Sequence, residues 1–509
     1  MRFALTEEAM RRAEERAVAE RGRTLRELME HAGTAVADEV SRRYPQGRVV
    51  VLAGGGNNGG DGWVTARVLR ERGRDVLVVP ASDPSRLKGE ADAAFAAARA
   101  AGVSSAAFPG ALGIGLAVTL ADAAVLVDAL FGIGFHGEVR EPHASVIAQL
   151  VDADAPVVAV DVPSGVNADS GGADGPFVRA DCTVTFSAPK PGLLVEPGRS
   201  AAGELVVADV GVPEDILAAE ADVELFDRSD LALLLPKPLP SEHKGSRGRI
   251  LIVAGSARYT GAAVLAAMGA LRIGAGYVHV AAPQAVVDVV HAALPSVIAT
   301  PLPSSAAGTL SIAAADEILH LAASADALAI GPGLTHDAEV AGCVRRVLAG
   351  CALPAVVDAD ALNVFAGETR ALTSRPAPTL LTPHPGELAR VLGETTSEVA
   401  GDRLCYATKV VGEQLACLLK GPGTVVATEG RRAVIEAGGA GLAKAGSGDV
   451  LTGMLAALLG QGLPPYEAAV LGAHLHGRAG EIGGEALTET CVLPTDLPAY
   501  LPAAVRELT

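Results

Sequence analysis

Two glycine-rich loops, one in each half of the chain, constrain the fold more than any other feature. Residues 53–62 read AGGGNNGGDG and residues 444–450 read KAGSGDV, and each segment stands where a helix is expected to begin. The start of a helix offers unpaired N–H groups and a partial positive charge, so it binds phosphate groups readily. The sequence therefore predicts two phosphate sites, one in each of two domains.

The pattern of apolar runs places both domains in the α/β class. At about 100–200 residues per domain, a chain of 509 residues is expected to form two to four domains. Apolar runs without polar alternation are typical of parallel strands buried on both faces, and here they alternate with helical stretches such as residues 91–101. The predicted strands span residues 49–52, 76–79, 125–127, 157–160, 182–186 and 205–207, and then 249–254, 277–281, 327–330, 355–357, 379–381, 416–420 and 424–427.

A proline-rich segment separates the two series of strands. Pro236-Lys237-Pro238-Leu239-Pro240 fits neither a helix nor a central strand. We predict one domain over residues 1–215, a linker over 216–243 and a second domain over 244–509. No internal sequence repeat relates the halves, so they are expected to be different domains.

Charge and cysteine usage exclude several classes of function. The formal net charge of −18 argues against nucleic acid, which requires basic surfaces. No apolar run reaches the about 18 residues of a membrane span, and residues 1–23 are charged throughout, without the apolar stretch that is typical of a signal peptide. We therefore expect no membrane partner and a cytoplasmic protein, and scattered cysteines without a Cys-x-x-Cys pair agree with that location. The cysteines are Cys182, Cys343, Cys351, Cys405, Cys417 and Cys491.

The N-terminal loop matches a dinucleotide fingerprint only in part. Gly54, Gly56 and Gly59 fit the pattern Gly-x-Gly-x-x-Gly after a strand. The full fingerprint also requires an acid at the end of the second strand, to bind the ribose hydroxyls. Here that strand ends Val78-Val79-Pro80, which disfavours a dehydrogenase.

Two further strands of the first half lead directly to acidic residues. Asp128 follows residues 125–127, and Asp161 follows residues 157–160. Ligands of a parallel sheet bind beyond the carboxyl ends of its strands, so Asn58, Asp128, Asp161 and Ser164 are expected to converge. An oxygen-only cluster suits a hard cation. The alternative is that one or both acids only cap the turn that follows.

These segments resemble the NAD(P)H-hydrate epimerase family over roughly residues 1–215. The resemblance rests on NNGGDG at residues 57–62, on residues 128–137 and on DVPSG at residues 161–165. It implies a Rossmann-like three-layer domain, with potassium bound by Asn58, Asp128 and Ser164. The residues that it implies for the hydrated nicotinamide nucleotide are Asn57, Asn58, Gly59, Gly60, Asp61, Gly132, Ile133, Gly134, Phe135, His136, Gly137, Glu138 and Asp161.

The implied reaction inverts the hydroxyl-bearing carbon of the damaged nicotinamide ring. Inversion requires the reversible loss and return of hydroxide or of a ring proton, so Asp161 is the candidate acid and base. An aspartate has an unperturbed pKa of about 3.9, and burial must raise it before the group donates a proton near neutral pH.

The C-terminal glycine-rich loop is suited to phosphoryl transfer. Its backbone N–H groups can surround a phosphoryl group while Asp449 accepts a proton from a hydroxyl nucleophile. The alternative is an aspartate that only caps the helix predicted over residues 450–459. Four other loops follow predicted strands, at residues 254–262, 331–334, 382–387 and 420–424.

Together these segments resemble the ribokinase-like superfamily, and within it the nucleotide-dependent NAD(P)H-hydrate dehydratases, over roughly residues 225–505. The most specific combination is GPG at residues 331–333, TPHPGE at 382–387 and AGSGD at 445–449. The resemblance implies that Ala262, Gly333, His384 and Asp449 contact the hydrate. The implied nucleotide-binding residues are Lys420, Gly421, Pro422, Gly423, Thr424, Gly446, Ser447 and Gly448.

The two resemblances imply one metabolite, the hydrated forms of NADH and NADPH. The first domain interconverts their epimers. The second phosphorylates the S-form from ADP with magnesium, and loss of phosphate and a proton then restores NAD(P)H and leaves AMP. Catalytic roles fall to Asp161 and Asp449, and we expect a homo-oligomer.

Two other functions remain open from the residues alone. A kinase of a small alcohol with an attached nucleotide-binding regulatory domain would release a stable phosphorylated product. A nucleotide sensor would use the N-terminal loop only to bind. The acids beside both loops argue against a sensor, because binding a polyanion does not require nearby carboxylates.

Overall fold

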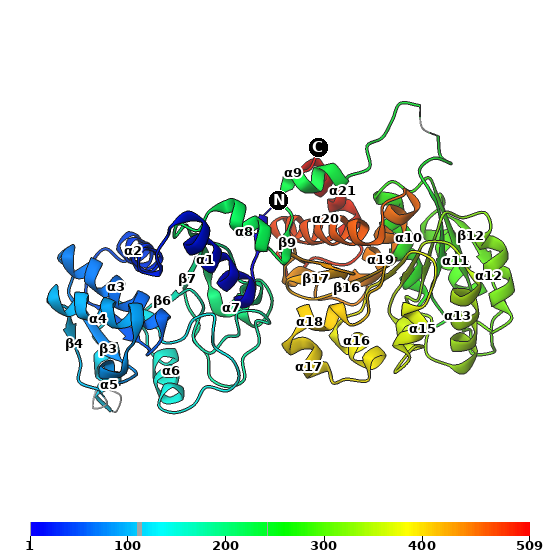
Figure 1. Ribbon diagram of the computed structural model, residues 1–509. Helices are drawn as coiled ribbons and strands as arrows, with labels where there is room; N and C mark the ends of the chain where they lie inside the picture. The colour runs from blue at the N-terminus through cyan, green and yellow to red at the C-terminus, as the bar shows by residue number, and fades with distance from the viewer. Residues whose placement is uncertain (1, 109–113, 242) are drawn as a thin grey trace. The chain divides into compact units, whose positions relative to one another are not determined.

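The computed structural model describes residues 2–108, 114–241 and 243–509, which divide into two compact units (Figure 1). One unit comprises Phe3–Glu224, and the other comprises Leu225–Thr509 together with Met1–Arg2. The division passes through the short strands β1 (Arg2–Ala4) and β9 (Val223–Leu225). No helix in the described ranges is long and apolar enough to cross a membrane.

The N-terminal unit is built on a seven-stranded sheet in the order β4-β3-β2-β5-β6-β7-β8, and all of its strand pairs are parallel. Its strands are β2 (Val49–Ala53), β3 (Val76–Pro80), β4 (Ser104–Ser105), β5 (Val125–Ala129), β6 (Val157–Val160), β7 (Cys182–Phe186) and β8 (Glu204–Ala208). Its helices are α1 (Glu7–Arg21), α2 (Leu25–Arg43), α3 (Asn57–Glu71), α4 (Gly89–Ala100), α5 (Ile114–Ala121), α6 (His143–Val151), α7 (Gly198–Ala202) and α8 (Glu214–Glu220).

Alternate residues of these strands enter two different hydrophobic cores. Val49 and Val51 of β2 pack with α1, α2, α3 and α4 on one face of the sheet, whereas Val50 and Leu52 pack with α5 and α6 on the other. A strand buried on both faces must be apolar at every position, which explains the uninterrupted apolar runs. The result is three layers, with a sheet between two sets of helices.

The C-terminal unit contains a larger, mostly parallel sheet. From β18 the order is β18-β17-β16-β15-β14-β13-β10-β11-β12, and only the pairs β16–β17 and β17–β18 are antiparallel. Its strands are β10 (Arg249–Val253), β11 (Tyr277–Ala282), β12 (Ile298–Pro301), β13 (Ala327–Ile330), β14 (Ala355–Val357), β15 (Thr379–Leu381), β16 (Leu415–Leu419), β17 (Thr424–Thr428) and β18 (Arg431–Ile435).

Helices cover both faces of this sheet as well. Buried residues of α10, α11, α19, α20 and α21 form one core with the sheet, and α16 and α18 lie on the opposite side (Figure 1). The helices are α9 (Arg228–Leu234), α10 (Thr260–Arg272), α11 (Gln284–Ala293), α12 (Ala314–Ala322), α13 (Ala338–Gly350), α14 (Asp360–Asn363), α15 (Thr369–Thr373), α16 (Pro385–Leu392), α17 (Thr396–Gly401), α18 (Arg403–Thr408), α19 (Ser447–Gly460), α20 (Pro465–Leu487) and α21 (Leu497–Arg506).

The structure confirms the predicted α/β class and every predicted strand. The sequence analysis missed β1, β4, β9, β12 and β18, which lie at or near sheet edges. Two boundaries differ in ways that matter for the sites: Asp128 lies inside β5, and α19 begins at Ser447, so that Asp449 lies in its first turn. Part of the predicted linker, residues 216–243, is folded into α8, β9 and α9, and its residue 242 lies outside the described ranges.

Candidate active sites

The N-terminal glycine-rich loop lies where the strand order of its sheet reverses. The chain runs from β2 outward to β3 and β4 on one side and from β5 to β8 on the other, and ligands bind at such a point. Close packing accounts for two of the glycines. A Cβ on Gly59 would lie 2.1 Å from the carbonyl oxygen of Gly54, and a Cβ on Gly54 would lie 2.0 Å from that of Leu130. The loop therefore tolerates no side chain at either position.

Three predicted metal ligands of this unit lie together. Ser164 donates to Asp128 twice, from Oγ to Oδ1 at 2.6 Å and from the backbone N–H to Oδ2 at 2.8 Å. The Asn58 amide donates to the carbonyl oxygen of Phe131 at 2.8 Å, and the Phe131 N–H donates to Ser164 Oγ at 2.9 Å. The loop after β5 thus links Asn58 to the pair formed by Asp128 and Ser164.

Asp128 is fully buried, and its hydrogen-bond partners within the described residues are neutral: Ser164 and the backbone N–H of Leu130. Burial raises the pKa of Asp128 to about 6, and these hydrogen bonds only partly offset that effect. A buried carboxylate is costly without a positive charge nearby. The oxygens of Asn58, Asp128 and Ser164 match the ligand preference of a hard monovalent cation, so the residues fit the expected potassium.

Asp161, the predicted acid and base, follows β6 in an unusual backbone conformation. Its φ of +65° is in the left-handed region, which residues other than glycine rarely adopt. Its Oδ1 accepts from Lys190 Nζ at 2.5 Å, from Thr185 Oγ1 at 3.1 Å and from the Phe186 N–H at 3.2 Å. Lys190 is buried, and the sequence analysis did not identify it.

Two further carboxyl groups are electrostatically coupled to Asp161. Burial, followed by the charges of Asp161 and Glu14, raises the pKa of Asp61 well above its ordinary value. Burial also raises the pKa of Glu14 to about 7, against an opposing effect of Lys190. Asp61 lies in the first turn of α3 and Glu14 lies on α1. The site thus combines one salt-bridged carboxylate with two carboxyl groups whose pKa values are raised by burial.

The other predicted substrate contacts lie on the loop between β5 and α6. His136 pairs with Glu7 at 2.5 Å and with the Asn167 amide at 3.1 Å. A Cβ on Gly134 would lie 3.6 Å from Glu7 Oε1, and a Cβ on Gly132 would lie 3.2 Å from the Asn58 side chain. The loop of residues 132–138 therefore contacts α1 through His136 and adjoins the Asn58 side chain at Gly132.

In the C-terminal unit, the loops after four adjacent parallel strands carry the predicted site residues or their neighbours. The segments are residues 331–333 after β13, Asp358 after β14, residues 382–387 after β15, and Lys420 after β16. Because these strands are parallel neighbours, their carboxyl ends meet at one edge of the sheet. One edge therefore gathers segments that are about 90 residues apart in sequence.

A buried ion pair lies at this edge. Lys420 Nζ donates to Asp358 Oδ1 at 2.8 Å and lies 3.8 Å from Glu387 Oε2, while Thr452 Oγ1 donates to Asp358 Oδ2 at 2.6 Å. Burial alone would lower the pKa of Lys420, but the charges of Asp358 and Glu387 outweigh it and raise that pKa. Lys420 is thus held as a cation beside the start of α19.

Asp449, the predicted base, lies in the first turn of α19. Burial is the main cause that raises the pKa of Asp449 to about 7, followed by the charge of Asp358, while Lys420 acts in the opposite direction. A Cβ on Gly448 would lie 3.5 Å from Lys420 Nζ, so the lysine adjoins the glycine-rich loop. A carboxyl with this pKa is suited to exchange a proton near neutral pH.

His384 is the N-cap residue of α16, so it does not lie in an isolated surface turn. Its Nδ1 accepts from the N–H groups of Gly386 at 3.0 Å and Glu387 at 3.3 Å, and Glu387 Oε2 accepts from the His384 N–H at 2.8 Å. Burial lowers the pKa of His384, which favours the neutral ring. The half-exposed ring is therefore fixed at the same edge as Lys420.

The segment of residues 420–424 forms the predicted turn, which joins β16 to β17. Arg403, a buried residue of α18, donates to the carbonyl oxygens of Pro422 at 2.5 Å and Leu419 at 3.0 Å. A Cβ on Gly421 would lie 2.9 Å from the Arg403 guanidinium. Arg403 thus holds the backbone of the turn, and the sequence analysis did not identify it.

The remaining predicted hydrate contacts lie at the switch point of this sheet. Gly333 has a φ of +67°, and a Cβ on it would lie 3.0 Å from Cβ of Ala262. The Gly255 N–H donates to the Pro332 carbonyl oxygen at 2.7 Å, which joins the loops after β10 and β13. The structure therefore brings Gly333, on the loop after β13, against Ala262 in the first turn of α10.

His476, a buried residue of α20, supports the start of α19. Its Nε2 donates to the carbonyl oxygen of Ser447 at 3.0 Å. Burial lowers the pKa of His476 to about 4, so the ring is neutral near pH 7. A buried neutral histidine in this position anchors the loop by a hydrogen bond and not by charge.

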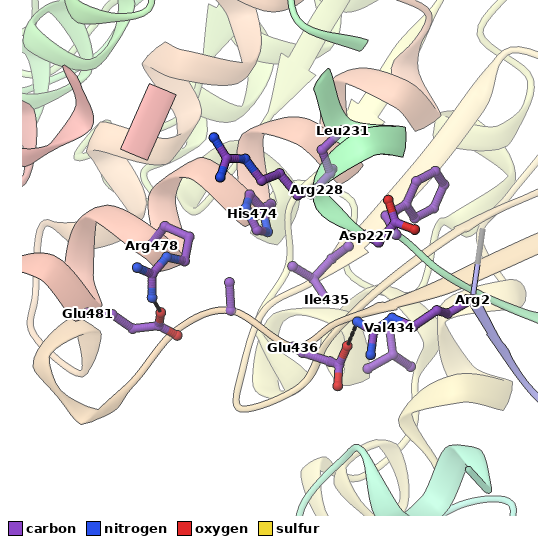
Figure 2. A pocket seen from close by; sticks show the side chains of 12 residues that line it. Arg2, Asp227, Arg228, Leu231, Val434, Ile435, Glu436, His474, Arg478 and Glu481 are labelled. Atoms are coloured by element: carbon purple, nitrogen blue, oxygen red, sulfur yellow. Dashed lines mark hydrogen bonds and ion pairs between the residues drawn. The ribbon is translucent and has the colours of Figure 1, made fainter. Parts of the chain in front are cut away.

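A cavity of about 380 Å³ lies elsewhere in the C-terminal unit, and none of its lining residues is a predicted site residue (Figure 2). Charged side chains in its wall pair with one another: Arg2 with Glu436 at 2.8 Å, and Arg478 with Glu481. The cavity therefore adds no group to either candidate site.

Comparison with known proteins agrees with both halves of this description. Residues 250–503 match the family model described as NAD(P)H-hydrate dehydratase, and residues 25–192 match the model described as YjeF-related protein N-terminus. The bifunctional NAD(P)H-hydrate repair enzyme Nnr of Moorella thermoacetica is 42% identical over 490 residues, which cover 94% of this chain and 92% of that protein. The chain belongs to the family of bifunctional NAD(P)H-hydrate repair enzymes.

Other members of the repair-enzyme family extend the match. The Nnr protein of Thermofilum pendens is 38% identical and covers 94% of this chain, with 92% of its own length matched. A solved ADP/ATP-dependent NAD(P)H-hydrate dehydratase of Bacillus subtilis, co-crystallised with ATP and Mg²⁺, is 30% identical. It covers 56% of this chain and 99% of its own, with a TM-score of 0.49.

Membership of the repair-enzyme family confirms the predicted bifunctional enzyme, with an epimerase half and a dehydratase half. It also confirms the predicted α/β class of both halves and the ribokinase-like dehydratase fold of the second. The residue assignments, the potassium and the oligomeric state stay predictions.

Proposed function

We propose that the N-terminal unit epimerises the R- and S-forms of NAD(P)H hydrate at the edge that carries Asp161. The observation that supports this most directly is the meeting of three groups there: the glycine-rich loop at the start of α3, the cluster of Asn58, Asp128 and Ser164, and a carboxylate held in a strained turn. In this proposal the segments of residues 57–61 and 132–138 contact the nucleotide.

Epimerisation then proceeds by exchange of the ring hydroxyl. A carboxyl donates a proton to the hydroxyl on C6, the C–O bond breaks as the nitrogen lone pair forms a C=N bond, and water leaves. Water returns to either face of the planar carbon and gives up a proton to a carboxylate. Asp161 donates the first proton and takes up the second, so no net change of atoms or charge occurs.

Potassium would be held in this unit by Asn58, Asp128 and Ser164. Its positive charge would compensate the buried carboxylate of Asp128, whose partners within the protein are neutral. That carboxylate and Ser164 in turn hold the loop after β5.

We propose further that the C-terminal unit dehydrates the S-form by phosphorylating it. Asp449 takes the proton of the C6 hydroxyl, whose oxygen then attacks the terminal phosphoryl group of ADP, and AMP leaves. The N–H groups at the start of α19 and the Lys420 ammonium balance the charge that moves during transfer. The phosphate then leaves C6 as the nitrogen lone pair moves in, and loss of the C5 proton gives NAD(P)H.

Magnesium would enter this unit with the nucleotide. The described residues contain no group of three or more His, Cys, Asp or Glu side chains that would hold a metal by themselves. Mg²⁺ is usually bound by one or two carboxylates together with phosphate oxygens, and one or two of the carboxylates at this edge would supply the protein part, from among Asp358, Glu387 and Asp449. It would neutralise phosphate charge during transfer.

The experiment follows the absorbance band of reduced nicotinamide with purified protein and a mixture of both NADH-hydrate epimers. Magnesium, potassium, and ADP or ATP are added in turn. Recovery of the whole pool with nucleotide supports both proposals. Recovery that stops at one epimer contradicts the proposal for the N-terminal unit. No recovery with either nucleotide would instead favour the kinase of a small alcohol, to be tested with a set of phosphoryl acceptors.

A further inference from the structure

The two neighbouring strands β6 and β7 end in the same unusual turn. After β6, the Val162 N–H donates to the Val160 carbonyl oxygen at 2.8 Å across Asp161, whose φ is +65°. After β7, the Ala188 N–H donates to the Phe186 carbonyl oxygen at 2.7 Å across Ser187, whose φ is +62°. Three-residue turns with positive φ are rare and strained, so the surrounding contacts must hold them.

Lys190 supplies those contacts from a fully enclosed position. Its side chain is 1% exposed. Nζ donates to Asp161 Oδ1 at 2.5 Å, to Thr185 Oγ1 at 2.9 Å and to the Phe186 carbonyl oxygen at 2.9 Å. An ammonium group has three protons, so these partners use all of them. Lys190 therefore has no donor left for a substrate.

The contacts of Asp161 are divided unequally between its two oxygens. Lys190, Thr185 and the Phe186 N–H all donate to Oδ1. Within the described residues, no hydrogen bond is directed to Oδ2. A carboxylate anchored through one oxygen keeps the lone pairs of the other oxygen for a reacting proton.

We propose that Lys190 is a positioning residue of the epimerase site, which fixes Asp161 through Oδ1 and so presents Oδ2 as the oxygen that exchanges the proton. The inference rests on the role proposed above for Asp161. Lys190 joins the two strained turns, because it contacts the side chain at the first and the backbone that leads into the second.

The test compares Lys190→Met with Lys190→Gln in the full-length protein. Met removes the charge and every donor, whereas Gln keeps donors without the charge. For Met we expect kcat of epimerisation to fall on the order of 10²-fold with KM little changed, because a displaced acid or base costs that much and Lys190 contacts no substrate. Gln should lie between Met and the parent.

Dehydration of pure S-hydrate by the same samples serves as the internal control, because it uses the other unit. If Met prevents folding of the N-terminal unit, which its thermal unfolding would reveal, the Gln variant supplies the same comparison. An unchanged kcat of epimerisation in a folded Lys190 variant, or a rise in KM without a fall in kcat, would overturn the inference. Asp161→Asn separates the two claims: if this variant epimerises at the parental rate, the role of Asp161 itself is wrong.

Discussion

Each unit contains a lysine that pairs with a buried aspartate at the carboxyl edge of its sheet, but the two lysines are enclosed to different degrees. Lys190 is 1% exposed and Lys420 is 21% exposed. Lys190 has three acceptors within 2.9 Å, whereas Lys420 has one at 2.8 Å and a second carboxylate only at 3.8 Å. The same residue type thus serves two different purposes.

The two purposes differ in how many ammonium N–H groups have an acceptor among the described residues. A lysine whose protons are all used inside the protein can only fix its partner, so Lys190 acts through Asp161. Lys420 keeps donors free beside Gly448, and an ammonium with free donors at the start of a helix attracts phosphate. The burial of an ion pair does not by itself show whether its lysine positions the partner or binds a ligand.

The largest effects are expected at the two acids that these lysines serve. Asp449→Asn should lower nucleotide-dependent dehydration by 10²-fold or more, roughly the contribution of a general base, and leave epimerisation intact. Asp161→Asn should do the reverse. The measurement is the rate of each half-reaction with a single epimer as substrate. Loss of both activities in either folded variant would contradict the assignment of one site to each unit.

The pH dependence of dehydration gives a second test at Asp449. A base must be ionised, and burial raises the pKa of Asp449 to about 7. The rate of dehydration should therefore fall as pH decreases through about 7. Single-turnover rates across pH 5 to 9 with saturating nucleotide would measure this dependence. The logarithm of the rate should change by about one per pH unit, as for the loss of one proton. A flat profile down to pH 5 would mean that Asp449 is not the group that limits the reaction.

Lys420→Met is expected to weaken nucleotide binding, in contrast to the kcat effect expected at Lys190. A charged hydrogen bond contributes about 1.5–3 kcal/mol, so KM for ADP should rise about 10- to 100-fold. Steady-state kinetics with varied ADP and saturating S-hydrate measure this change, and epimerisation in the same sample is the control. An unchanged KM for ADP would remove the distinction between the two lysines.

Potassium should stabilise the N-terminal unit more at pH 7 than at pH 5. Burial raises the pKa of Asp128 from 3.8 to about 6, so its contribution to stability is complete below pH 3.8 and is lost as pH rises through about 6. A bound cation compensates the charge that appears. Thermal unfolding in potassium and in tetramethylammonium chloride at both pH values tests this. Asp128→Asn should remove both the pH effect and the potassium effect; a potassium effect that persists would place the cation elsewhere.

The sequence predicted the strands that build each site because a buried parallel strand has to be apolar throughout. The same reasoning, that a polar residue after such a strand faces the ligand edge, found Asp128 and Asp161. Applied to residues 355–357, it would also have found Asp358, which follows β14 directly.

Lys190 and Arg403 gave no comparable signal. Lys190 lies four residues after the end of β7, and Arg403 lies on a helix. Lysine and arginine are usually exposed, so neither residue stands out by type. Their roles depend on tertiary contacts with Asp161 and with the carbonyl oxygens of Leu419 and Pro422, which no local pattern encodes.

The smallest expected effects come from a matched pair of threonines. Thr185 Oγ1 donates to Asp161 at 3.1 Å, and Thr452 Oγ1 donates to Asp358 at 2.6 Å. Thr185→Val and Thr452→Val each remove one hydrogen bond and keep the shape of the side chain.

At Thr185 the lysine and a backbone N–H still hold Asp161, so we expect the rate of epimerisation to fall only several-fold, equivalent to about 1 kcal/mol. Without the Thr452 hydroxyl, Asp358 is held within the described residues by the partly exposed Lys420 alone. The rate of dehydration should therefore fall further than the rate of epimerisation does in Thr185→Val. Rates of both half-reactions in both variants measure this, and an equal loss in the two units would show that the enclosure of the lysine does not determine how firmly its aspartate is held.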